Sequence, residues 1–405
     1  MHQPDEALSL ILAALADVAP LPPERVPLRE AVARALAEDV PATRPLPPFD
    51  SAQMDGYALR AADAPRSGAR LRVAFEVFAG AAAPPPLPPG ACCRIFTGAP
   101  IPAGADAVEM QEEVARRGTI ATFRRAPRRG QFVRAAGSDL ARDAVALARG
   151  TALDPGAIGL LAALGRSEVQ VHRRPQVALL ATGDEIAPID RPPGDYQVAD
   201  SNSHALAAAV AEAGATPVLL PVARDTPRSL ATALAGAGAF DAPVSTGGVS
   251  VGARDLVRTA LVRAGARLAF WKVAMRPGKP LAFGRLGRTA VFGLPGNPAS
   301  ALVTFELFVR PALRVLAGLR GRGRAVVTAR LAAPVERPPG LTHYVRARIR
   351  RQDGALVATP LRSQVSGDLT SSACFQALVV LPPGRARARQ GELVEAILVA
   401  APEEG

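Results

Sequence analysis

Lysine is nearly absent from this 405-residue chain. Its 48 basic residues include only Lys272 and Lys279, so all the others are arginine. Asparagine is equally scarce, because Asn202 and Asn297 are the only two. A lysine ammonium is a compact, adjustable point charge that the planar guanidinium of arginine does not replace. Two lysines so close together therefore indicate a site, although chance survival explains them as well when they are considered alone.

Cysteines, aromatic residues and long apolar runs are also few. Three cysteines, of which Cys92 and Cys93 are adjacent, provide neither a disulfide framework nor zinc-binding spacing. This pattern favours a reducing compartment, the cytoplasm, and Cys374 is expected to be a buried small apolar residue. No run of about 18 apolar residues predicts a membrane span, and the N-terminus has no secretory signal. We therefore expect no membrane partner.

The net charge of +12 raises the possibility of nucleic-acid binding. Aromatic residues make up only 4% of the chain and the arginines are scattered, so a platform on which the bases of a nucleic-acid strand could stack is missing. We therefore expect no nucleic-acid partner. Most arginines then belong to a solvated surface, and the rest could concentrate an anionic small molecule in a cleft.

Hydrophobic periodicity divides the chain into regions of different character. Near the N-terminus it predicts a helix after Pro4 and a second helix over residues 28–38. An alternating strand over 69–78, and short strands near 92–96, 106–113 and 118–125, predict a small β-rich module. Asp154 and Pro155 are typical of a helix start, with the end at Gly165.

From residue 175 strands alternate with helices, which predicts a parallel α/β domain. The strands are expected at 177–180, 217–222, 243–245 and 290–293, and the helices at 203–214, 227–238 and 254–265. Beyond Gly318 the alternation stops, and the strands expected at 325–335, 343–350, 355–360, 377–381 and 392–400 predict a small β-barrel.

Three loops follow predicted parallel strands, at residues 182–185, 246–252 and 295–300. Ligands of open parallel sheets bind at the carboxyl ends of the strands, so these loops should converge on one crevice. Gly247 and Gly248 allow close backbone approach to an anion before the next helix, although such a turn is by itself more often a plain connection. The loop matches neither a Walker A motif nor a dinucleotide fingerprint.

Carboxylates gather in the same domain, at Glu185, Asp200, Asp225 and Asp255. Each one alone is best explained as a helix cap. Beside the two lysines they favour Mg²⁺ and a phosphate ester or anhydride.

Eight segments together resemble the MoeA family of molybdopterin molybdenumtransferases, which includes the C-terminal domain of gephyrin, and they occur in that family's order. They are residues 49–58, 94–102, 137–139, 182–185, 200–202, 247–255, 272–280 and 293–300. The resemblance covers nearly the whole chain and weakens after about residue 320. It implies a multidomain α/β plus β fold with an elongated N-terminal domain (1–45 with 139–172) and a small β-rich domain (46–138). A central α/β domain of the molybdopterin-adenylyltransferase type (173–318) and a C-terminal β-barrel (319–405) complete it.

Carried over by motif, the resemblance implies two sets of site residues. The catalytic set is Asp55, Asp139, Glu185, Asp225, Asp255, Lys272, Arg276 and Lys279, with Mg²⁺ on Asp225 and Asp255. The substrate-binding set is Thr97, Thr182, Gly247, Gly248, Ser250, Gly252, Pro280, Asn297, Ser300, Arg346 and Ser366. The sequence departs from the family in having Arg276 where lysine is usual and Ala199 where an aromatic is common. Around Arg346 and Ser366 the match is loose.

The implied reaction inserts molybdenum from molybdate into adenylylated molybdopterin and releases AMP. The resemblance also implies a homodimer that builds each cleft from both subunits. Transient contacts with the molybdopterin adenylyltransferase and with downstream molybdenum-cofactor proteins are expected. Two alternatives stay open, the adenylyltransferase itself and a gephyrin-like scaffold. The first is essentially the α/β domain alone, and the second would carry appended partner-binding segments.

Overall fold

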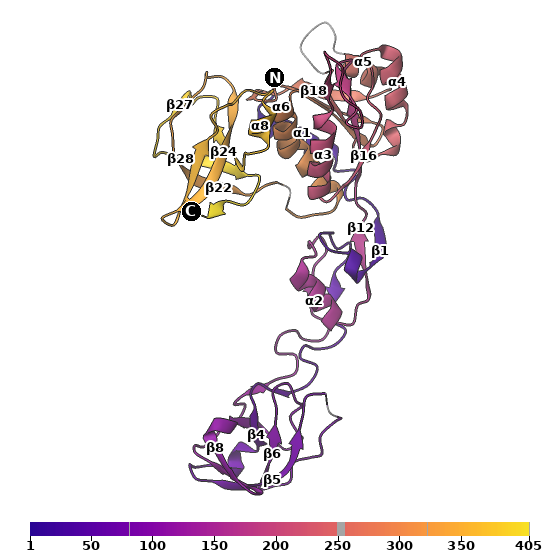
Figure 1. The fold of residues 1–405 in the computed structure, drawn as a ribbon. Coiled ribbons are helices and arrows are strands. Elements are labelled where there is room, and N and C mark those ends of the chain that lie inside the picture. The colour runs from indigo at the N-terminus through magenta and orange to yellow at the C-terminus, as the bar shows by residue number, and fades with distance from the viewer. Residues whose placement is uncertain (81, 249–255, 322, 405) are drawn as a thin grey trace. The chain divides into compact units, whose positions relative to one another are not determined.

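The computed structural model describes residues 1–80, 82–248, 256–321 and 323–404 (Figure 1). The chain forms two compact units. The first comprises Met1–Glu38, Gly150–Ile158 and Glu168–Gly405, and the second comprises Asp39–Arg149 and Gly159–Ser167. No described helix is long and apolar enough to cross a membrane.

The second unit is built around a six-stranded sheet in the order β7-β4-β6-β5-β9-β8, which confirms the small β-rich module. In β5 the buried side chains of Leu71, Val73 and Val77 lie on the core side, as the alternation predicted, whereas Phe75 is half-buried. The strands and short helices of this unit are β2 (Val40–Pro41), β3 (Ser51–Ala52), β4 (Gly56–Leu59), η2 (Ala61–Asp63), β5 (Arg70–Val77), β6 (Ala91–Ile95), β7 (Ala107–Met110), η3 (Gln111–Glu113), β8 (Val114–Arg117), β9 (Ile120–Phe123), β10 (Val133–Arg134) and β11 (Val145–Leu147).

Near the N-terminus one predicted helix forms and the other does not. Helix α1 (Pro4–Ala14) begins as expected and buries Ala7 and Ile11. The helix predicted over residues 28–38 is wrong, because only one turn, η1 (Leu28–Glu30), is helical. The segment after it makes backbone bridges instead, Ala35 with Ala152 and Leu36 with Val171. Strand β1 (Pro23–Pro27) pairs with β12 (Glu168–His172), and α2 (Pro155–Ala163) is capped by Asp154.

The central domain is a six-stranded sheet in the order β16-β13-β17-β21-β20-β18, between two layers of helices (Figure 1). Its strands are β13 (Gln176–Ala181), β16 (Thr216–Leu219), β17 (Val244–Thr246), β18 (Arg267–Lys272), β20 (Pro280–Leu286) and β21 (Thr289–Leu294). Its helices are α3 (Ser201–Glu212), α4 (Pro227–Ala235), η4 (Ala237–Ala239), α5 (Leu256–Arg263), α6 (Pro298–Thr304), η5 (Phe305–Val309) and α7 (Arg310–Leu316). The short pair β14 (Ile186–Ala187) and β15 (Val198–Ala199) lies outside the sheet.

The predicted α/β domain is thus confirmed, but its sheet is mixed rather than purely parallel. Strand β20 runs antiparallel to both β21 and β18, and neither β18 nor β20 was predicted. One sheet face packs on α1, α3 and the α6–η5–α7 helix around Phe292 and Phe305. The other face packs on α4 and α5 around Leu230 and Val257.

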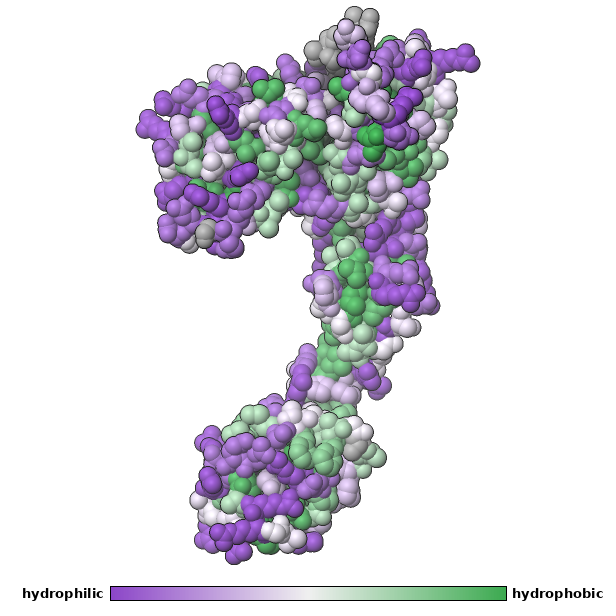
Figure 2. Space-filling model, in the orientation of Figure 1, coloured by the Kyte–Doolittle hydropathy of each residue, from purple (hydrophilic) through white to green (hydrophobic). Residues whose placement is uncertain are grey.

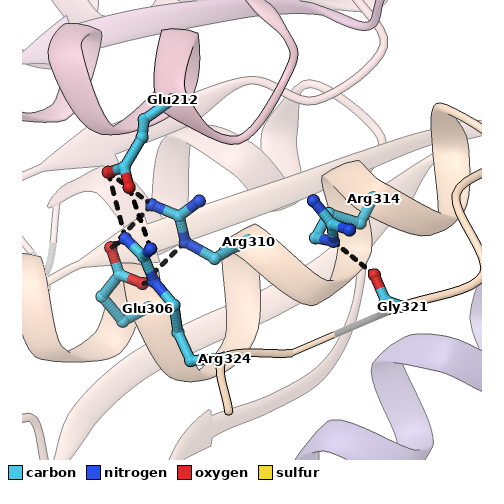
Figure 3. Close-up of polar contacts among 6 residues, drawn as sticks. All are labelled: Glu212, Glu306, Arg310, Arg314, Gly321 and Arg324. Carbon is cyan, nitrogen blue, oxygen red and sulfur yellow. Dashed lines mark hydrogen bonds and ion pairs between the residues drawn. The ribbon is translucent and has the colours of Figure 1, made fainter. Parts of the chain in front are cut away.

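Four charged side chains connect α3 to the α6–η5–α7 helix (Figure 3). Both arginines of the network, Arg310 and Arg324, contact both carboxylates, Glu212 and Glu306. The side chain of Glu306 is 5% exposed and that of Glu212 is 56% exposed. Nearby, Arg314 donates to the carbonyl of Gly321. The buried pair of Glu306 and Arg310 lies within the helix that follows the loop at residues 295–300, and Glu212 links this pair to α3.

The C-terminal domain is the predicted β-barrel. Strands pair in the order β24-β25-β22-β28-β26, and β26 pairs again with β24, which closes the barrel. Its core includes Ile349 and Val379, and on the visible face hydrophilic residues are interspersed with hydrophobic ones (Figure 2). Its elements, with the connecting β19, are β19 (Met275–Arg276), β22 (Val326–Leu331), β23 (Val335–Glu336), β24 (Thr342–Gln352), β25 (Ala355–Pro360), α8 (Leu369–Ser372), β26 (Ala377–Leu381), β27 (Arg387–Ala388), β28 (Leu393–Leu398) and β29 (Glu403–Glu404).

The cysteines divide into two kinds. Cys92 and Cys93 are buried in β6, and burial raises the pKa of each thiol to about 12. Both therefore stay neutral and unreactive at physiological pH. Cys374 is exposed, so the expectation that it is a buried apolar residue is wrong.

Candidate active site

A cleft of about 720 Å³ opens at the carboxyl ends of the central strands. The loops after β13, β17 and β21 form it, together with Gly367 and Leu369 from the barrel. Among the predicted site residues, those that line it are Thr182, Glu185, Gly247, Gly248, Pro280 and Asn297. The three marked loops therefore converge as the sequence predicted, because β13, β17 and β21 are mutually parallel and end at one edge.

Gly247 and Gly248 sit where no side chain fits. Both have positive φ, +87° and +65°. A Cβ on Gly247 would lie 2.6 Å from the carbonyl oxygen of Thr182, and one on Gly248 would lie 2.4 Å from Cγ2 of Val257. The glycines thus let the loops after β13 and β17 pack closely and leave backbone groups facing the cleft without side chains above them.

Carboxylates border the cleft beside the first loop. Glu185 lines the cleft, and the backbone N–H of Asp225 donates to a carboxylate oxygen of Asp184 at 3.3 Å, so the loops that carry Asp184 and Asp225 are in contact. Asp200, by contrast, is a buried helix cap that accepts from the N–H of Ser203 at 3.0 Å. Ser250, Gly252 and Asp255 lie outside the described residues. Within the described ranges no three metal-ligating side chains gather at one point.

The two lysines reach the same edge of the sheet from neighbouring strands. Lys272 ends β18 and is paired across the ladder with Pro280, which lines the cleft. The carbonyl of Lys279 accepts from the N–H of Val273 at 3.0 Å, which closes the turn between the two lysines. Lys279 and Arg276 are exposed and Lys272 is half-buried.

The barrel contributes a buried cation that holds the loop leading to the cleft residue Gly367. Arg346 in β24 is 0% exposed, and its Nη2 donates to the carbonyls of Ser363 and Val365 at 3.2 and 3.0 Å. Its Nε and Nη1 have no hydrogen-bond partner among the described residues. Burial lowers the pKa of this guanidinium, and the negative charge of Asp368 opposes that shift.

The loop that Arg346 supports is attached to the α/β domain. Asn297 donates from Nδ2 to Oγ of Ser366 at 2.9 Å, and the N–H of Ala299 donates to the carbonyl of Ser366 at 3.1 Å. Asn202 donates to the carbonyl of Gly296 at 2.7 Å. Both asparagines of the chain thus fix walls of one cleft. Ser300 is buried one turn further along α6.

Some cleft residues were not predicted as site residues. Asp200 and Asn202 fell within a matching segment, so their positions were available from the motifs. Gly367 and Leu369 were not, because the sequence match in the barrel is loose and only the fold brings this loop to the sheet edge.

Three predicted residues belong to the second compact unit. There Asp55 accepts from the N–H and the hydroxyl of Thr97 at 2.8 and 2.7 Å. These two hydrogen bonds lower the pKa of the Asp55 carboxyl, so it is ionised at neutral pH. Asp139 forms an ion pair with Arg134.

Three family models match successive parts of the chain. Residues 2–165 match the MoeA N-terminal region (domain I and II), residues 178–315 a probable molybdopterin binding domain, and residues 328–399 the MoeA C-terminal region (domain IV). The chain belongs to the MoeA family.

Relatives of this family resemble the chain over nearly its whole length. A molybdopterin molybdenumtransferase of Bacillus subtilis is 34% identical over 93% of this chain and 90% of its own. Molybdopterin molybdenumtransferase 1 of Mycobacterium tuberculosis is 36% identical over 99% of both chains. The crystal structure of a molybdopterin biosynthesis MoeA protein from Pyrococcus horikoshii superposes with a TM-score of 0.82 at 31% identity, covering 98% of each chain. The family resemblance of the sequence motifs is thereby confirmed.

Proposed function

We propose that the chain is a molybdopterin molybdenumtransferase that transfers molybdenum from molybdate to adenylylated molybdopterin and releases AMP. The observation that carries this proposal is the cleft at the carboxyl edge of the sheet, with a buried cation beside it. A fully buried guanidinium with unpartnered N–H groups is costly unless an anion balances it. Molybdate is a dianion whose oxygens accept such charge-assisted hydrogen bonds.

The proposed binding of the two substrates follows from the chemistry of the cleft walls. Arg346, Ser366 and Ser300 hold the molybdate oxygens from the barrel side, and Arg276 and Lys279 add positive charge. Lys272 lies beside Pro280 and assists at the phosphoanhydride, where negative charge grows on the leaving phosphate. The glycine turn at Gly247 leaves room for the pterin-bearing portion of the substrate.

We propose that Mg²⁺ binds to acidic residues of the loops that follow the parallel strands. Mg²⁺ prefers oxygen ligands and is commonly held by one or two carboxylates together with substrate phosphates. We assign it to Asp225 and Asp255, and Asp184 lies against the first of these. When bound, the ion would neutralise charge on the phosphoanhydride.

The order of domains favours the transferase over the adenylyltransferase. The family matches extend on both sides of the α/β domain, over residues 2–165 and 328–399. An enzyme that needs the α/β domain alone has no use for a barrel loop that brings Gly367 and Leu369 to the cleft. We place the enzyme in the cytoplasm, in transient contact with the adenylyltransferase and with recipients of the cofactor.

We also infer a homodimer, in which Asp55, Thr97 and Asp139 complete the cleft of the partner subunit. The support is that these three residues lie in a different compact unit from both lysines. Light scattering of the active protein measures this directly. A fully active monomer would contradict it.

The proposed reaction is tested by AMP release from adenylylated molybdopterin with and without molybdate and Mg²⁺. We expect release that depends on both. Asp255→Asn should lower kcat more than it raises KM, since its role is in the transition state. Arg346→Gln should raise the molybdate concentration needed for half-maximal release, whereas Arg348→Gln, on the same strand but exposed, should not. Release that ignores molybdate would refute the proposal.

A further inference from the structure

The chain has a single tryptophan, Trp271, and almost half of its surface lies in solvent. It belongs to the edge strand β18 and precedes Lys272 directly. Its exposed fraction is 47%. Trp271 thus keeps nearly half of a large, flat aromatic surface accessible to a ligand.

An arginine covers the ring. The guanidinium carbon of Arg258, on α5, lies 4.5 Å from the centroid of the Trp271 ring. This is within the range of a cation–π contact, and the arginine side chain is itself exposed. An indole and a guanidinium held together in this way form a flat, positively charged platform.

For each member of the platform, a residue next to it in the chain contacts a residue that lines the cleft. Lys272, next to Trp271, pairs with the cleft residue Pro280. Val257, next to Arg258, packs against the cleft residue Gly248 and leaves no room there for a Cβ. The platform therefore lies at the rim of the cleft, on the same sheet edge as the glycine turn.

We propose that Trp271 and Arg258 form a stacking site for the adenine base of the adenylylated substrate and of the AMP product. This inference rests on the proposed function and names the part of the substrate that the rim recognises. Aromatic rings and arginine planes bind nucleobases by stacking without requiring a particular hydrogen-bond pattern. A half-exposed stacking site suits the portion of the substrate that must leave after the phosphoanhydride is cleaved.

The phosphate of the same nucleotide would lie toward the lysines. Lys272 and Lys279 both lie at the sheet edge where β18 ends, so a nucleotide whose base stacks on the indole can extend its phosphate around that edge toward the ammonium groups. The pterin is also a flat nitrogen heterocycle. We favour adenine because the platform lies at the rim of the cleft, where the leaving AMP can depart. The experiment has to separate these two heterocycles.

Because Trp271 is the only tryptophan, red-edge excitation of the whole protein reports on this ring alone. AMP should quench its emission in a saturable way, with free N-acetyltryptophanamide correcting for absorption by the nucleotide. Ribose 5-phosphate has the same sugar and phosphate without a base, and it should leave the emission nearly unchanged. A free pterin should not compete with AMP for the quenching site.

Calorimetric titration then tests the variants, with AMP as the ligand. We expect roughly a tenfold loss of AMP affinity in Trp271→Ala, because the base then loses its aromatic stacking partner. Trp271→Phe, which keeps a ring, should stay within about threefold of the parent protein. Leu219→Ala is the matched control, because Leu219 is 47% exposed on the opposite edge strand of the same sheet, and it should bind AMP normally.

Four results would overturn the adenine assignment. The first three are equal quenching by ribose 5-phosphate, unchanged AMP affinity in Trp271→Ala, and competition by the pterin. Loss of ribose 5-phosphate binding in Trp271→Ala to the same degree as AMP would also overturn it, since the change would then act through the fold. None of these results bears on molybdate-dependent turnover, so the two proposals fail separately.

Discussion

The charged network on the α6–η5–α7 helix makes a sharp prediction, because its two carboxylates contact the same two arginines from different environments (Figure 3). Oxygen atoms of Glu306 accept from Nε and Nη2 of Arg310 at 2.6 and 2.9 Å. The Arg310 side chain is 4% exposed, so little water reaches it if this partner is lost. Glu212 binds the same arginine at 3.0 Å but is 56% exposed.

We expect Glu306→Gln to lower the free energy of unfolding by about 3–5 kcal/mol, the range for breaking a buried ion pair on one side. Glutamine keeps the shape of glutamate, so the loss is electrostatic and not a cavity effect. Glu212→Gln should cost about 1 kcal/mol or less, because water screens and replaces an exposed partner. The difference between these two variants isolates the effect of burial at constant chemistry.

Denaturant unfolding followed by Trp271 emission measures both variants. This ring lies in the same sheet that packs on η5, next to the core residue Phe270. The midpoint should fall clearly in Glu306→Gln at unchanged slope and shift little in Glu212→Gln. Equal shifts in the two variants would refute the reasoning, since the network would then behave as a surface feature throughout.

Two further predictions concern the cleft. Lys279→Arg should lower activity about tenfold at low molybdate, because the bulkier, planar guanidinium replaces an adjustable ammonium. Its activity should recover partly at high molybdate. Arg276→Lys should be tolerated. Steady-state AMP release over a range of molybdate concentrations measures both, and wild-type behaviour of Lys279→Arg would mean that the scarcity of lysine carries no functional message. Gly248→Ala should raise KM for the adenylylated substrate, because its Cβ would meet Val257 at 2.4 Å, whereas Gly287→Ala, at a similar φ of +60° in open space, should leave KM unchanged.

Local patterns were sufficient for much of the fold. Helices with a proline in the first turn, such as α1 and α4, formed where the sequence placed them. Strands bounded by glycine or proline, such as β5 and β13, did so too. These elements combine one periodicity with clear end signals, so propensity, capping and burial agree.

The failures have a different physical origin. Residues 28–38 show helical spacing, yet Leu36 pairs with Val171 and its N–H donates to Thr151, so long-range pairing takes the backbone groups a helix would use. Strands β18 and β20 were missed because register shifts interrupt the ladder between them, and such irregularities obscure a strict alternation. Cys374 follows the short helix α8 in an exposed turn, and residue type alone cannot specify that position.

The difference between local patterns and long-range packing also explains which parts of the site the sequence predicts. The scarcity of lysine and asparagine pointed to Lys272, Lys279 and Asn297. Because the carboxyl-end loops of a parallel sheet meet, the side of the cleft formed by the α/β domain was predictable. Arg346 was expected to bind substrate only through a loose family match, because its burial, its unpartnered N–H groups and the attachment of its loop to Asn297 depend on how two domains pack. Trp271 is the clearest case. A lone tryptophan in a strand is usually a core residue, and only the pleat of an edge strand, with an arginine from a neighbouring helix above the ring, makes it a surface on which a base can stack.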